Sequence, residues 1–209
     1  MAKPLKDQNT PRLLAVVVAN LAVFLLILRA DALAAASLEQ LTKDIGDLLP
    51  AALAIAVLTI ANGLIDAETK ARLVFWRWAN PLPGCRAFSE HAQRDPRVDV
   101  GALERKLGEL PTDERQQNST WYRLYKSVES DPGVTHNHRD YLFTRDYASL
   151  AALFLVVLGG LATYQIDDWG RTLSYIAFLA AQYLIVRHVA TGYAHRFVTT
   201  VLAVKAAED

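Results

Sequence analysis

The chain has 209 residues, of which 52% are hydrophobic and 21% are charged, and its formal net charge at pH 7 is zero. A neutral chain lacks the general attraction to nucleic acid that a basic protein has, and a single cysteine cannot form an intramolecular disulfide. These totals exclude a disulfide-stabilised scaffold and give no support to a nucleic-acid-binding protein. The apolar residues are concentrated in separate runs, so each segment has to be interpreted separately.

Four apolar runs, taken in chain order, predict membrane-spanning helices. They cover residues 13–28, 48–65, 147–164 and 172–187, and no charged residue lies in their interiors. Each run approaches the roughly 20 residues that cross a hydrocarbon core about 30 Å thick, and a backbone in lipid must be helical to satisfy its own hydrogen bonds. A soluble protein with four buried helices is the alternative. A signal-peptide cleavage site at 30–36 is less favoured because further apolar runs follow.

The distribution of lysine and arginine predicts the orientation. Both terminal tails and the segment 67–145 carry basic residues, with 13 Lys or Arg in that segment, whereas the first and third loops are poor in them. Cytoplasmic segments of membrane proteins are enriched in this way. The sequence therefore predicts a multi-pass protein of the cell inner membrane, with the N- and C-termini in the cytoplasm.

The predicted architecture is an all-α, polytopic membrane protein with four transmembrane helices and a helical cytoplasmic insert between helices 2 and 3. Three parts follow in order: the N-terminal tail and first transmembrane hairpin (1–66), the insert (67–145), and the second transmembrane hairpin with the C-terminal cytoplasmic tail (146–209). Cys85, in the insert, is then a free thiol in a reducing compartment.

Within the insert, helix signals follow one another. A helix is predicted over 67–78, ending before the NPLPG stretch that begins at Asn80. Asp99 is an N-cap candidate for a helix to about residue 107, and Thr112 is one for the next helix. Asp131 followed by proline predicts a third helix that runs unbroken into the third span. No strand pattern appears.

Aromatic and basic residues interleave at the start of the insert, and this is the predicted partner-binding or lipid-binding surface. Trp and Arg together suit a membrane interface, and they also suit a protein interface. A phosphate-bearing ligand is a third alternative, but direct nucleic-acid binding is disfavoured because the insert has a net charge of only +2. The residues are Arg72, Phe75, Trp76, Arg77, Trp78, Arg86, Arg94 and Arg97, with Trp121 and Tyr125 from the second insert helix.

Three amides, Asn20, Asn62 and Gln182, are the polar candidates inside the spans. We expect them to fix helix packing or, in a homo-oligomer, to line a pore. No charge lies at mid-membrane, which argues against a proton relay. His136 and His138 are two residues apart, so on a helix they point about 200° apart and cannot share a metal ion. They are expected to be solvated surface residues, and the sequence predicts no metal, no cofactor and no catalytic residues.

The function expected first is a non-enzymatic membrane scaffold or sensor that binds a cytosolic partner through the insert. The alternatives are an oligomeric pore-forming or membrane-disrupting effector, and a membrane enzyme acting on lipid substrates. In its layout the chain resembles small four-span proteins of bacterial anti-viral defence systems, such as the membrane component of Kiwa and the four-span effectors linked to nucleotide-signalling operons. This resemblance, which concerns layout alone, implies a membrane component of an anti-phage defence system.

Overall fold

Helices form all of the regular structure in the computed structural model, which describes residues 4–29, 55–57, 59–60 and 62–208. Within these residues no strand is present, which confirms the predicted all-α class. The 3-10 helix η2 and the π-helix η3 lie among α-helices. The elements are α1 (Leu5–Gln8), α2 (Thr10–Leu28), α6 (Ala67–Phe75), η2 (Pro83–Arg86), η3 (Ala87–His91), α7 (Ala92–Arg94), α8 (Val100–Leu107), α9 (Glu114–Ser127), α10 (Pro132–Gln165) and α11 (Trp169–Ala207).

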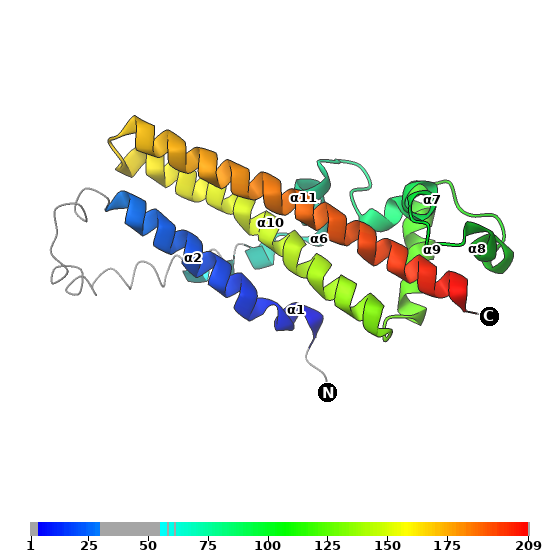
Figure 1. Cartoon of the computed structure of the whole chain (residues 1–209). Coiled ribbons are helices and arrows are strands. Elements are labelled where there is room, and N and C mark those ends of the chain that lie inside the picture. Colours follow the sequence, from blue (N-terminus) through cyan, green and yellow to red (C-terminus); the bar gives the residue numbers. More distant parts are fainter. Residues whose placement is uncertain (1–3, 30–54, 58, 61, 209) are drawn as a thin grey trace. The chain divides into compact units, whose positions relative to one another are not determined.

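Three helices are long and apolar enough, by length and composition, to cross a membrane. They are α2 with 19 residues, α10 with 34 and α11 with 39 (Figure 1). These helices contain three of the four predicted runs and suggest a multi-pass membrane protein. Half of the remaining run, 48–65, lies outside the described residues, and its residues 55–57, 59–60 and 62–64 are helical.

The chain divides into two compact units. One contains Met1–Asp66 and Asp146–Val186, and the other contains Ala67–Arg145 and Arg187–Asp209. We call them the apolar unit and the insert unit. The long helices α10 and α11 each contribute residues to both units, and within each unit they lie side by side (Figure 1).

The apolar unit is held together by a core between α2, α10 and α11. From α2, the buried residues Val17, Leu21 and Phe24 recur every three to four residues, which places them on one face of the helix. They pack with buried residues of the other two helices, including Phe154 and Leu179. Large apolar side chains also cover the outside of this unit, as expected for a surface that faces lipid.

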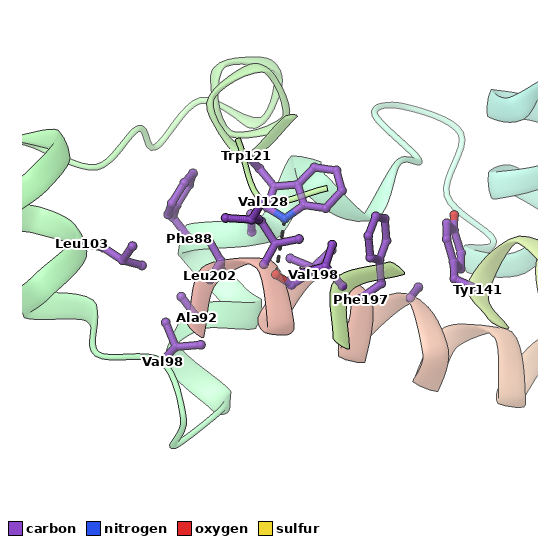
Figure 2. Close-up of a cluster of buried hydrophobic side chains, with 14 residues drawn as sticks. Phe88, Ala92, Val98, Leu103, Trp121, Val128, Tyr141, Phe197, Val198 and Leu202 are labelled. Atoms are coloured by element: carbon purple, nitrogen blue, oxygen red, sulfur yellow. Dashed lines mark hydrogen bonds between the residues drawn. The ribbon is translucent and has the colours of Figure 1, made fainter. Parts of the chain in front are cut away.

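The insert unit has a separate hydrophobic core, to which α11 contributes through its C-terminal half (Figure 2). Trp121 of α9 is buried there, and its indole N–H donates a hydrogen bond of 3.3 Å to the carbonyl oxygen of Val198. The Phe197 ring meets the Trp121 ring edge-on at a centroid distance of 5.2 Å. The residues that follow the fourth predicted span are therefore part of a folded helix rather than only a tail.

Most helix starts follow the predicted caps. The Asp99 side chain accepts a hydrogen bond from the backbone N–H of Ala102, and α8 ends at Leu107 as predicted. The helix α10 begins at Pro132 and is unbroken to Gln165, which confirms the long third insert helix. The cap of α9 is Asp113 instead of Thr112, because the carboxylate accepts two backbone N–H groups of the first helical turn.

Candidate functional site

The aromatic and basic segment begins with a turn directly after α6. The predicted helix over 67–78 is three residues too long, since α6 ends at Phe75. Trp76 and Asn80 both adopt positive φ, at 52° and 47°, and this left-handed conformation stops the helix. Asn tolerates that region well, but a bulky residue such as Trp is rarely found there. We call residues 76–80 the tryptophan turn.

Both tryptophans of this turn are exposed, Trp76 by 58% and Trp78 by 85%. The guanidinium carbon of Arg187 lies 3.8 Å from the centroid of the Trp76 ring, which is a close cation–π contact. Arg187 directly follows Val186, the last residue of α11 that belongs to the apolar unit. The contact therefore attaches the tryptophan turn to the residue at which α11 leaves the apolar unit.

Ion pairs and hydrogen bonds fix the turn on its other side. The Arg72 guanidinium donates to the Trp78 carbonyl at 3.2 Å and to the Glu68 carboxylate at 3.0 Å. Glu114, the first residue of α9, is paired with Arg77 and accepts a hydrogen bond of 2.9 Å from the Asn80 amide. These two partners, Asn80 first, lower the pKa of the Glu114 carboxyl.

A hollow of about 400 Å³ opens between α6, the tryptophan turn and α9. Charged and amide side chains line it together with the indole of Trp78. These lining residues are Glu68, Arg72, Trp78, Asn80, Arg115 and Asn118, and Cys85 lines the hollow as well. We call this the arginine hollow, and Arg72 and Trp78 are its two members that the sequence analysis predicts as binding residues.

The remaining predicted arginines are engaged within the insert unit. Arg86 and Arg94 both pair with the Glu90 carboxylate, at 3.0 and 2.8 Å. Arg97 pairs with Asp95 at 2.7 Å and also donates to the Thr199 hydroxyl, and these hydrogen bonds lower the pKa of the Asp95 carboxyl. The structure thus gives these three residues internal contacts, and the guanidinium carbon of Arg86 also lies 5.6 Å from the centroid of the Phe75 ring, next to the tryptophan turn.

The predicted aromatic residues outside the turn lie in or against the core. Trp121 is only 6% exposed, and Tyr125 stacks on it with ring centroids 5.9 Å apart. Phe75 packs against the same core. Trp121 therefore offers no exposed ring to a partner, since its ring is buried and its N–H group is hydrogen-bonded inside the insert unit.

The three amides of the apolar unit lie in different settings. Asn20 donates to the carbonyl of Val16 in its own helix at 2.9 Å. Gln182 of α11 donates to the Tyr147 hydroxyl of α10 at 3.1 Å, a bond that joins two helices. Asn62 is buried, and its side-chain oxygen has no hydrogen-bond partner among the described residues.

Two histidine contacts were missed by the sequence analysis. His91 and His195 are 104 positions apart, and their Nδ1 atoms lie 3.0 Å from each other. Burial and the neighbouring His195 lower the pKa of His91 to about 4. His138 is not a solvated surface residue as predicted, because its ring stacks on Phe197 at 4.4 Å and its Nδ1 lies 3.1 Å from the Tyr125 hydroxyl.

Metal-binding geometry is absent from the described residues, where no group of three or more His, Cys, Asp or Glu side chains could hold an ion. Comparisons with protein-family models, with curated proteins and with solved structures found no match to this chain.

Proposed function

We propose that this chain is a non-enzymatic inner-membrane scaffold or sensor whose insert unit binds a cytosolic protein. In this proposal residues 48–65 also form a spanning helix, the second in chain order, both termini are cytoplasmic, and copies of the chain associate in the membrane. The alternation of basic and non-basic segments supports the orientation. The layout of the chain, as a membrane hairpin on each side of an insert, extends the proposal to a membrane component of an anti-phage defence system.

The observation that carries the proposal is that the insert folds with the end of α11 as a unit with its own core. A segment that merely linked two hairpins would not need buried residues such as Trp121, Val134 and Leu202. The arrangement gives a rigid surface on helical elements, which is what the binding of a protein partner requires.

The outer face of α9 is the surface best suited to that partner. Tyr122 is 51% exposed, and the neighbouring Arg123 is exposed as well. Arg123 also lines a shallow hollow of about 680 Å³ that includes Leu110 and Pro111. Tyr and Arg are enriched among the residues that contribute most to protein interfaces. On this face they replace Trp121 and Tyr125, which the sequence had suggested.

Cross-linking in intact cells, followed by purification of the full chain with its membrane, tests the proposal. The wild-type chain, expressed together with its neighbouring genes, is expected to recover one discrete cytosolic protein. The double variant Tyr122→Ala, Arg123→Gln is expected to lose most of it, whereas Trp78→Ala is expected to keep it. Equal recovery with the double variant, or no discrete protein with the wild type, would refute the proposal. Phage plating on the same cells tests the defence role.

A pore-forming or membrane-disrupting effector is the second candidate, and Asn62 is the observation that favours it. Its buried side-chain oxygen has no hydrogen bond to the part of the chain that the structure describes, which is costly in an apolar unit, and contact with a second copy or with pore water would offset that cost. Membrane potential and dye entry in cells expressing the chain distinguish the two candidates. Depolarisation that is lost when Asn20 and Asn62 are changed to Leu would favour the pore, and intact membranes would favour the scaffold.

A further inference from the structure

The arginine hollow has the chemistry of a site for a singly charged phosphate group. Arg72 comes from α6 and Arg115 from α9, so two separate elements each contribute an arginine to the lining of one space of about 400 Å³. Guanidinium groups bind phosphate oxygens through paired N–H donors. Asn118 adds an amide to the lining, and the Trp78 indole adds an apolar wall.

The charge balance of the lining favours a monoanion. Glu68 offsets Arg72, with which it forms an ion pair of 3.0 Å, and Arg115 then leaves the lining with one net positive charge. A phosphodiester carries one negative charge, whereas a nucleoside triphosphate carries several. The site therefore matches a phosphodiester better than it matches a nucleotide.

Arg72 is held in place before any ligand arrives. Its Nε bonds to the Trp78 carbonyl and its Nη2 bonds to Glu68, which fixes the plane of the guanidinium and leaves Nη1 outside both bonds. Arg115 is exposed at the start of α9. Because Arg72 is already fixed and Arg115 is exposed, a ligand can bind without a rearrangement of the site. This lowers the entropic cost of binding.

The segment that lines this site is joined directly to the apolar unit along the chain. Ala67, the first residue of α6, directly follows Asp66, the last residue of the apolar unit before the insert. Trp76 contacts Arg187, which is the residue that follows the apolar unit in α11. Trp78, in the wall of the hollow, is two residues from Trp76. Tryptophan and arginine at such a boundary are typical of a membrane interface.

We propose that the arginine hollow binds the phosphodiester head group of an anionic phospholipid, with Arg72 and Arg115 pairing with the phosphate and Trp78 lying against the glycerol and the first acyl carbons. This inference rests on the membrane location in the proposed function. It makes the tryptophan turn a specific lipid contact of the insert unit, separate from the α9 face that receives the protein partner.

Native mass spectrometry of the full chain in detergent, titrated with phosphatidylglycerol or phosphatidylcholine, tests this site. The wild-type chain is expected to retain phosphatidylglycerol in preference to phosphatidylcholine. Arg115→Gln is expected to weaken phosphatidylglycerol binding about fivefold, the effect of one cation near an anionic lipid. Trp78→Ala is expected to weaken it as well. Arg123→Gln is the matched control, since it removes the same charge from an exposed position of the same helix that lines a different hollow.

Three results would overturn the proposal. The first is equal affinity for both lipids, and the second is an equal loss in Arg115→Gln and Arg123→Gln, which would indicate bulk charge rather than a site. The third is displacement of the bound lipid by millimolar glycerol 3-phosphate or ATP, which would identify a soluble phosphate ligand. None of these results depends on recovery of the protein partner, so failure here is distinguishable from failure of the scaffold proposal.

Discussion

At the scale of single residues, Gly84 has the least space for a side chain among the glycines that the structure describes. A methyl group added there would lie 2.5 Å from the side-chain oxygen of Asn118 and 2.7 Å from the Trp121 ring. Because Trp121 is held by its own core contacts, Gly84→Ala is expected to destabilise the unit by about 1–3 kcal/mol. Gly101→Ala, in α8, is the control and should be neutral or stabilising, since its added methyl meets atoms only at 3.4 Å. Thermal unfolding of the two variants in detergent compares them directly, and equal midpoints would contradict this packing.

The buried histidines predict a pH dependence. Burial lowers the pKa of both His91 and His138 to about 4, with His195 adding to the effect at His91 and Arg145 and Lys126 at His138. An unfolded imidazole has a pKa of about 6.5, so between pH 6.5 and 4 the unfolded chain binds protons that the folded chain does not. Stability is therefore complete above pH 6.5 and falls as the pH is lowered toward 4.

The expected loss between pH 7.5 and 5.5 is about 1 kcal/mol for each of the two histidines, or several degrees in the unfolding midpoint. His138→Gln should reduce the difference between the two midpoints, because it removes one group that must stay neutral in the folded state. His188→Gln is the control, since His188 is exposed on α11. A pH difference that His138→Gln leaves unchanged would mean that this ring is solvated in the folded chain.

At the scale of elements, local sequence signals predict which segments are helical. They do not predict where α6 ends or which distant residues come into contact. Helix caps depend on residues within one or two helical turns of each other, so the sequence predicts the starts of α8 and α10. The left-handed turn at Trp76 has no local cause in its own residue type. The contact between His91 and His195 joins residues that are 104 positions apart, and no local pattern in the sequence predicts such a pair.

The C-terminal half of α11 has a helical pattern of apolar residues that its average hydropathy does not show. Apolar residues recur there at positions 190, 194, 197, 198, 201 and 202, the three-to-four-residue spacing of a buried helix face. The apolar run of the fourth predicted span ends at residue 187, and hydropathy predicts only a tail after it. The helical spacing of the apolar residues after position 187 predicts the face that the insert unit buries.

Phe197→Ala tests the importance of that face. Its ring contacts those of Trp121, Tyr125, His138 and Tyr141, so truncation should cost about 3–5 kcal/mol. We expect faster limited proteolysis within residues 67–145 while the chain still inserts into membranes. Phe178→Ala, on the outer side of the same helix where the ring is 48% exposed, is the matched control. Equal protease resistance in both variants would show that α11 does not support the insert unit.

At the scale of the whole molecule, the orientation in the membrane is the prediction on which the proposed functions depend. Cys85 cannot report it, because the residue is buried and burial is the main cause that raises the pKa of its thiol. A thiol of that kind reacts slowly with maleimide on either side of a membrane. The native cysteine can therefore remain in place as a low background while new cysteines are introduced at exposed positions.

Asp167→Cys and Ser130→Cys are suitable positions, since both residues are exposed outside the helices, between α10 and α11 and before α10 respectively. With cytoplasmic termini, the α10–α11 turn faces outward, because the basic segment 67–145 and that turn lie on opposite sides of the third span. An impermeant maleimide is thus expected to label Asp167→Cys on intact cells and Ser130→Cys only after permeabilisation. The reverse pattern would put the insert unit outside the cytoplasm, where it could meet neither a cytosolic partner nor the inner leaflet. Labelling of both positions on intact cells would show that α10 does not cross the membrane.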